Sequence, residues 1–164
     1  MSWSHVYGAR EITLPDGAVI LKVLFLHGLE SGPQGSKPKF LRSQGHEVHA
    51  PRLPKRSFAD SVRIAQSKVD EVKPDYIVGS SRGGAVAMSI NPHDAKLVLI
   101  APAWKKYNVS PDLPAGAVIL HSADDDIVPL KDSFGLPAQL YVCGDDHRMN
   151  DEGALYNLET ALRV

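Results

Sequence analysis

The sequence has few features of an extracellular or membrane-bound protein. It contains one cysteine, Cys143, so no disulfide can form within the chain. No apolar run approaches the roughly 20 residues that a membrane-spanning helix needs, and the first residues show no basic and apolar signal. We therefore expect a cytoplasmic protein with no membrane partner, in which Cys143 is a buried residue of a strand.

An excess of charge of one sign is also absent. The 18 basic and 19 acidic residues give a formal net charge of −1, whereas nucleic-acid-binding proteins usually carry a clear basic excess. We therefore expect no nucleic-acid partner. The 164 residues show no internal repeat, and 43% of them are hydrophobic, which is enough for one core. The sequence predicts one domain over residues 1–164 and gives no indication of oligomeric state.

What the chain does contain is a series of short, mostly apolar segments. They lie at residues 18–26, 47–50, 75–79, 96–101, 117–121 and 138–143. Short continuous apolar runs are typical of strands covered on both faces, as in a mainly parallel sheet. Before the first of them, Pro15-Asp16-Gly17 predicts a turn that joins an antiparallel strand to it.

Helical patterns separate several of these segments. The clearest begins after Ser57, a predicted N-cap with Asp60 three residues later, and ends before Pro74. Three further helices are expected, at residues 36–45, from 82 to the Asn91-Pro92 pair, and from 150 or 151 onward with Arg163 in the last turn. The alternation predicts an α/β protein: a three-layer sandwich with a mainly parallel sheet and helices on both of its faces.

One junction between a strand and a helix is rich in glycine. Residues 79–83 read G-S-S-R-G and fit the pattern G-x-S-x-G with Ser81 at its centre. A serine on such a sharp turn at the carboxyl end of a strand needs neighbours without a Cβ atom. Ser80 cannot be the central serine, because Val78 and Arg82 flank it at the glycine positions. Ser81 is therefore the candidate nucleophile, although small residues also occur where a helix simply packs closely on a sheet.

A nucleophilic serine needs a base and an orienting carboxylate, and on this type of sheet the chain order is serine, acid, histidine. The loop after residues 117–121 contains three consecutive aspartates, Asp124, Asp125 and Asp126. The loop after residues 138–143 contains His147. The residues alone leave open which aspartate is the acid.

Four segments, LFLHGLESG, VGSSRGG, HSADDDIVP and CGDDHRM, together resemble the α/β-hydrolase superfamily. The resemblance runs from about residue 18 to the end of the chain, and it is to small bacterial esterase-like members without a lid. The family motif H-G-x-x-D-x-x-V-P implies that Asp125 is the acid, with Ser122 where the family often has glycine and with Asp124 or Asp126 still open. The G-x-x-H pattern implies that His147 is the base.

The resemblance also implies an oxyanion hole, which binds the negative oxygen of the intermediate. The H-G pair of the family is His27-Gly28, so the implied donors are the backbone N–H groups of Leu29 and Arg82, with Glu30 as the alternative to Leu29. The side chains expected to contact substrate are those of Leu29, Glu30, Arg82 and Trp104, with Tyr107 and the loop around Pro33 as further walls.

The implied reaction is cleavage of a carboxylic ester through an acyl-enzyme. Only residues 102–116 separate two predicted strands where larger relatives insert a cap, so we expect short or surface-accessible acyl groups. Thioester or amide cleavage by the same residues, and a binding protein that keeps the fold without chemistry, remain alternatives. We expect no cofactor and no metal, because the acids lack calcium-loop or H-E-x-x-H spacing. HGLESGPQGSK is not a phosphate loop, because Lys37 follows Ser36 rather than preceding it.

Overall fold

The computed structural model describes residues 2–6, 9–13 and 19–163, and its main feature is a parallel sheet of six strands. The strands are β4 (Lys22–Leu26), β5 (Glu47–His49), β6 (Tyr76–Ser80), β7 (Lys96–Ile100), β8 (Val118–His121) and β9 (Gln139–Val142). Their order is β5-β4-β6-β7-β8-β9, and each neighbouring pair is parallel. Each strand overlaps one of the predicted apolar segments, so the predicted parallel sheet is confirmed.

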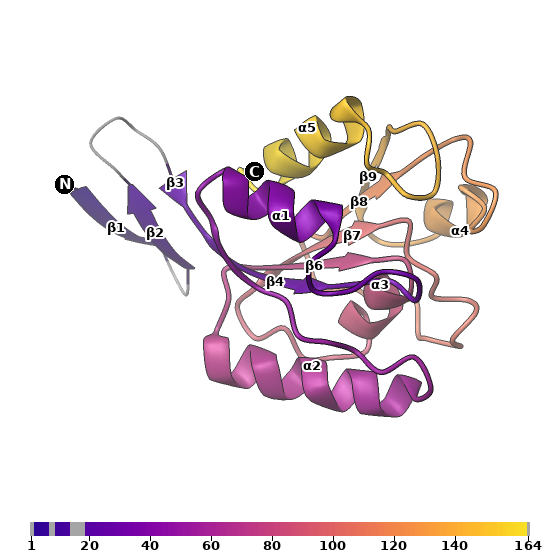
Figure 1. The fold of residues 1–164 in the computed structure, drawn as a ribbon, viewed down its shortest axis with the longest axis horizontal. Coiled ribbons are helices and arrows are strands. Elements are labelled where there is room, and N and C mark those ends of the chain that lie inside the picture. Colours follow the sequence, from indigo (N-terminus) through magenta and orange to yellow (C-terminus); the bar gives the residue numbers. More distant parts are fainter. Residues whose placement is uncertain (1, 7–8, 14–18, 164) are drawn as a thin grey trace.

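Helices cover both faces of this sheet (Figure 1). The helices are α1 (Ser36–Ser43), α2 (Phe58–Val72), α3 (Arg82–Ala87), α4 (Lys131–Phe134) and α5 (Glu152–Ala161). Successive strand side chains point to opposite faces. Val23 and Val78 therefore pack in one buried cluster with residues of α1 and α5, whereas Leu24 and Ile77 pack in a second cluster with residues of α2 and α3. The three-layer sandwich is confirmed.

The predicted helix boundaries are mostly confirmed by capping contacts. Ser57 Oγ accepts a hydrogen bond from the amide of Asp60 at 3.0 Å, and α2 ends at Lys73, whose φ of 52° is left-handed, just before Pro74. Asp151 caps α5 in the same way, since its carboxylate accepts from the Ala154 amide at 3.1 Å.

Two details of the predicted helices are wrong. α3 is six residues long and does not reach Asn91. The reason is that the amide of Ser89 bonds to the carbonyl of Val86, three residues back, at 2.9 Å, which tightens the chain out of the helix before Pro92. Arg163 lies beyond the end of α5 rather than in its last turn. The short helix α4 has no counterpart in the sequence analysis.

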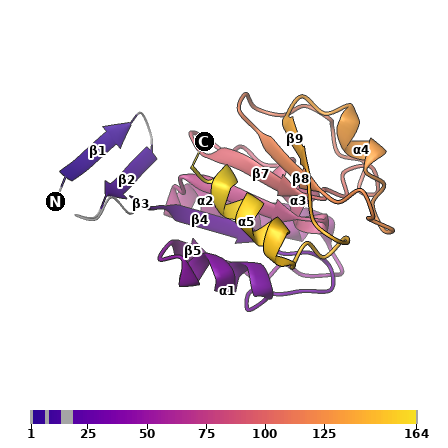
Figure 2. The same cartoon turned by 90° about the horizontal axis from the view of Figure 1, so that it is seen from above.

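The amino-terminal residues form a second, small sheet. It consists of β1 (Ser2–Val6), β2 (Ala9–Thr13) and β3 (Val19–Ile20), paired antiparallel in that order. β1 and β2 stand away from the six-stranded sheet (Figure 2). The expected antiparallel strand is therefore present, but it pairs with β3, and the predicted turn at Pro15-Asp16-Gly17 lies outside the described residues. No helix in the described ranges is long and apolar enough to cross a membrane.

Cys143 is half-buried rather than fully buried, and it lies just after β9 instead of within it. It packs against the core cluster that contains residues of α1 and α5. Burial raises the pKa of its thiol, which makes the group less reactive. Cys143 therefore has the packing role that was predicted for it, but it lies after the strand rather than within it.

Candidate active site

Ser81 occupies a strained turn between β6 and α3. Its φ of 55° and ψ of −114° are rare for a residue with a side chain, and its amide donates to the Ile100 carbonyl at 2.8 Å. A Cβ atom on Gly79 would lie 2.5 Å from the Gly83 carbonyl oxygen, and one on Gly83 would overlap the carbonyl oxygen of Leu26. Both positions therefore require glycine, for the steric reason predicted from the pattern.

The hydroxyl of Ser81 meets an imidazole and a carboxylate from two other loops. Ser81 Oγ lies 2.9 Å from His147 Nε2, and His147 Nδ1 lies 2.7 Å from Asp125 Oδ2. Because the carboxylate accepts from Nδ1, Nε2 is left without a proton and can accept the one on Ser81. The Asp125 side chain is fully buried, and that of His147 is 17% exposed. The structure thus brings together three of the predicted site residues in an order that permits proton transfer from the serine.

Asp125 is the aspartate of the three-residue run that reaches His147. Its second oxygen, Oδ1, accepts from the amides of Ile127 at 2.9 Å and Val128 at 2.8 Å. Burial raises the pKa of this carboxyl, but the hydrogen bonds from His147 and the two amides outweigh it and lower the pKa overall. Asp124 and Asp126 are exposed, and in the described part of the chain neither forms a hydrogen bond or ion pair with His147. Nor do any described His, Cys, Asp and Glu residues gather in threes so as to hold a metal ion.

A second histidine, His121, lies behind the carboxylate. Its Nε2 is 3.2 Å from Asp125 Oδ2 and 2.8 Å from the Val128 carbonyl, so Nε2 must carry the proton. Its Nδ1 then accepts from the Ser133 hydroxyl at 2.7 Å. His121 is fully buried, and its Nε2 approaches the same oxygen of Asp125, Oδ2, that accepts from His147. The sequence analysis did not identify Ser133, which lies on the unpredicted helix α4.

The loop after β4 lies directly against Ser81. A Cβ atom on Gly28 would be 3.5 Å from the Cβ of Ser81. His27 holds this loop: its Nδ1 donates to the Gly28 carbonyl at 2.7 Å, and its Nε2 accepts from the Leu53 amide at 2.9 Å. Burial, chiefly, lowers the pKa of His27 and keeps it neutral in this arrangement.

The amides of Leu29 and Arg82 are the two donors that the resemblance implied. Arg82 is the first residue of α3, so its N–H has no partner within the helix. Among the described residues, neither the Leu29 amide nor the Arg82 amide donates a hydrogen bond to a backbone carbonyl of a turn or loop. The Arg82 amide thus directly follows the serine, and the Leu29 amide belongs to the loop whose Gly28 lies against it.

The side chains expected to contact substrate have different surroundings. The Arg82 guanidinium is buried, donates to Ser61 Oγ at 3.1 Å and to the Pro54 carbonyl at 2.9 Å, and lies 5.7 Å from the centres of the Phe58 and Tyr107 rings. These two rings stack on each other, and Phe58 was not predicted to be near the site. The Arg82 side chain is therefore occupied by packing, and its amide is the group next to Ser81.

The remaining expected contacts lie nearer the surface. Glu30 is exposed, with its carboxylate 3.5 Å from Lys55 Nζ. Trp104 is half-buried, and its indole N–H donates to the Asp132 carbonyl at 2.9 Å. Leu29 and Pro33 are both half-buried. The loop at residues 101–117, described throughout, contains turns but no helix or strand, so it inserts no helical cap.

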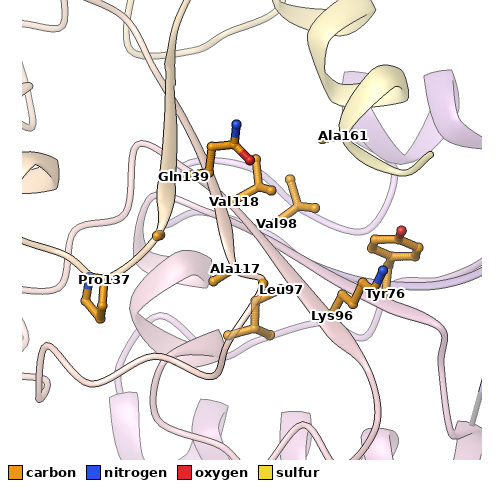
Figure 3. Close-up of a pocket in the computed structure, with 11 residues that line it drawn as sticks. Tyr76, Lys96, Leu97, Val98, Ala117, Val118, Pro137, Gln139 and Ala161 are labelled. Carbon is orange, nitrogen blue, oxygen red and sulfur yellow. The ribbon is translucent and has the colours of Figure 1, made fainter. Parts of the chain in front are cut away.

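A cavity of about 400 Å³ lies at the opposite end of the sheet (Figure 3). It opens at the amino-terminal ends of β7 and β8, between Lys96, Val118 and Gln139. None of the described residues that line it is a serine, histidine, cysteine or acidic residue. It therefore has no nucleophile and base of the kind found at Ser81, which lies at the carboxyl-terminal ends of the strands.

Comparisons with known proteins agree at the level of the fold. No family model and no curated protein sequence matches the chain. Several solved structures, in contrast, are similar to this chain. A CIB-like hydrolase from Thermoplasma acidophilum has a TM-score of 0.69 at 14% identity, covering 99% of this chain and 95% of that one. The alpha/beta hydrolase domain-containing protein 10 from mouse has a TM-score of 0.64 at 17% identity, with 99% and 97% covered.

An esterase domain from a Rhodothermus marinus protein has a TM-score of 0.56 at 19% identity, covering 95% of this chain and 87% of that one. These similarities cover nearly the whole length of both partners and include the six-stranded sheet. They confirm the fold that the sequence motifs implied, without an inserted cap. This chain has the α/β-hydrolase fold.

Proposed function

We propose that this protein is a serine hydrolase that cleaves carboxylic esters. The observation that carries the proposal is the chain of contacts from Ser81 Oγ to His147 Nε2 at 2.9 Å and from His147 Nδ1 to Asp125 at 2.7 Å. A binding protein would have no use for a strained serine whose hydroxyl faces an oriented base. An esterase domain among the solved structures of this fold supports the same reaction class.

The proposed reaction has two halves, acylation of Ser81 and hydrolysis of the acyl-enzyme, and the same catalytic groups act in both. His147 Nε2 takes the proton of Ser81 as its oxygen attacks the carbonyl carbon, and Asp125 stabilises the charged imidazole. The amides of Leu29 and Arg82 stabilise the negative oxygen of the tetrahedral intermediate. The alcohol leaves with the proton from His147, and water then releases the acid from Ser81 by the same steps.

The lack of a helical cap in residues 101–117 favours short or surface-accessible acyl groups. No cap stands over Ser81, since residues 101–117 form only turns. A long acyl chain would therefore leave much of its apolar surface in water, whereas a short one loses little. The same groups could cleave thioesters or amides, so the substrate panel should include all three bond types.

The decisive experiment is labelling with a fluorophosphonate probe together with ester hydrolysis. Ser80→Ala is the matched control, because Ser80 is the neighbouring serine and its hydroxyl forms no hydrogen bond within the described residues. We expect wild type and Ser80→Ala to be labelled and active, and Ser81→Ala to be neither. Undiminished hydrolysis by Ser81→Ala would show that another group is the nucleophile. A wild type inert toward the probe, esters, thioesters and amides would favour the binding-protein alternative.

A further inference from the structure

A buried lysine contacts the segment that carries His147. Lys37 is the second residue of α1 and is 8% exposed. Its Nζ donates to the backbone carbonyl of Arg148, and also to Oδ1 of Asn150 at 3.0 Å. Arg148 directly follows His147, so the ammonium group holds the chain one residue beyond the imidazole.

A buried lysine is energetically unfavourable if its side chain only fills space. Burying an ammonium group costs free energy unless hydrogen bonds compensate, whereas a methionine of similar length would fill the space without that cost. Burial lowers the pKa of Lys37 to about 8, although the charges of Asp146 and Asp151 act to raise it. The group is therefore still charged at neutral pH. Within the described ranges no carboxylate lies at ion-pair distance from Nζ, so its hydrogen bonds go to the His147 segment.

Apart from the bonds of His147 itself and the hydrogen bond from Ser122 Oγ to the Gly144 carbonyl, the other hydrogen bonds of this segment are internal to it. Asp146 Oδ1 accepts from the amides of Arg148 at 3.0 Å and Met149 at 3.2 Å, and the Asp145 amide donates to Asp151 at 3.0 Å. Such contacts define the shape of the loop but not its place relative to Ser81. Lys37 supplies a hydrogen bond from a different part of the chain.

The position of Lys37 in the chain explains why its contact with Arg148 matters for the site. α1 directly follows the loop of residues 27–35, which includes Gly28 beside Ser81. On the same face of the sheet, α1 lies next to α5, which follows the His147 segment (Figure 1). Lys37 thus connects the loop on one side of Ser81 to the segment that carries His147 on the other.

We propose that Lys37 is a positioning residue for His147: its hydrogen bonds to Arg148 and Asn150 keep the imidazole within reach of the Ser81 hydroxyl. The inference rests on the hydrolase function proposed above. Lys37 itself touches neither the reacting atoms nor the proposed oxyanion donors. It acts through the backbone, and a displacement of about 1 Å in a catalytic group can cost roughly a hundredfold in rate.

The test is Lys37→Met with Lys39→Met as the matched control, since Lys39 is exposed on the same helix two residues later. Active sites are first counted by titration with a fluorophosphonate, so that a loss of folded protein is separated from a loss of rate. We expect kcat per active site on a short-chain ester to fall about 10- to 100-fold in Lys37→Met, with KM changed by less than about twofold. Lys39→Met should match wild type.

A second pair of variants keeps the test decisive if Lys37→Met does not fold. Asn150→Ala removes one acceptor and leaves the lysine in place, and it should lower kcat by a smaller factor. Lys37→Arg keeps charged donors, and it should retain more activity than Lys37→Met. If Lys37→Met and Asn150→Ala act through the same contact, the double variant that combines them loses little more activity than Lys37→Met alone.

The outcomes separate this inference from the proposed function. A wild type that hydrolyses esters, together with folded Lys37→Met and Asn150→Ala whose kcat per active site stays within about twofold of it, would overturn the role of Lys37 alone. A wild type without hydrolase activity would overturn the proposed function, and the inference with it.

Discussion

The hydroxyl of Ser122 donates a hydrogen bond to the backbone carbonyl of Gly144 at 2.9 Å. The same oxygen accepts from the amide of Asp124 at 3.1 Å. Ser122 is fully buried, and it joins the loop that carries Asp125 to the loop that carries His147. The position where the family motif often has glycine therefore has a structural role here.

Replacing Ser122 by alanine should loosen this connection. The Gly144 carbonyl would lose its partner in a partly buried place, and the cost is about 1 kcal/mol of stability, the lower end of the usual range for an unsatisfied group. We expect a lower midpoint in urea denaturation and a kcat reduced several-fold, with KM little changed. Ser110→Ala is the control, because the Ser110 hydroxyl contacts Asp112 at the exposed surface. Equal stability of both variants would contradict the prediction.

The three neighbouring aspartates should differ sharply in their effect on catalysis. Asp125→Asn would stabilise the wrong imidazole tautomer of His147, and the expected loss in kcat is about 10⁴-fold. Asp124→Asn and Asp126→Asn should stay within a fewfold of wild type, because both side chains are exposed. Steady-state ester hydrolysis by the three variants provides the comparison. A large loss in either neighbour, with Asp125→Asn active, would reassign the acid.

Glycine at position 83 should be irreplaceable. An alanine Cβ there would overlap the carbonyl oxygen of Leu26, which belongs to a central strand. The backbone cannot yield without moving β4 or α3, so we expect Gly83→Ala to be insoluble or to unfold at a much lower temperature. Gly135→Ala is the control, since a Cβ at Gly135 would meet no atom within 4 Å. Thermal denaturation of the two variants should separate them clearly.

The hydrogen bond between His46, just before β5, and Glu159 of α5 should make stability depend on pH. His46 Nε2 donates to the Glu159 carboxylate at 3.0 Å, and its Nδ1 accepts from the Leu21 amide at 3.2 Å. Burial raises the pKa of Glu159, but the hydrogen bonds and charges of His46 and Arg163 outweigh it, so the pKa lies below the ordinary 4.5. The carboxylate therefore stabilises the fold above about pH 4.5, and this contribution is lost as pH falls through the lowered value.

Glu159→Gln should reveal this contribution directly. We expect it to lower the free energy of unfolding by about 1 kcal/mol at neutral pH, with the difference from wild type shrinking as the pH falls below about 4. Urea denaturation across this range measures it, with the exposed Glu71→Gln as control. A difference that grows in acid would contradict the assigned direction.

The absence of a cap should appear as a weak dependence on acyl length. We expect kcat/KM to be highest for short acyl esters and to change little or fall from acetyl to decanoyl, because the open site offers few walls to a long chain. A steady increase over that series, measured below the micelle-forming concentration of each ester, would show an acyl groove that the residues around Trp104 and Leu29 do not suggest.

Much of the architecture could be predicted because its causes are local. Ser57 and Asp60 lie three residues apart and cap α2 with no help from the rest of the molecule. The carboxyl-terminal end of α3 was mispredicted because the Ser89 amide bonds to the Val86 carbonyl, three residues back, and periodicity does not show this. The four residues of α4 are too few to produce a helical pattern, so Ser133 and its contact with His121 could not be foreseen.

The sequence by itself determined the six parallel strands and four of the five helices. It also singled out Ser81, because the need for glycine at positions 79 and 83 is a steric property of one short turn. Only the tertiary structure decided which of three adjacent aspartates meets His147, since neighbours in a loop differ in direction and not in composition. It alone showed Lys37 against Arg148, a contact between residues 111 positions apart. Contacts between residues so far apart depend on how helices pack against a sheet, and no local sequence pattern predicts that packing.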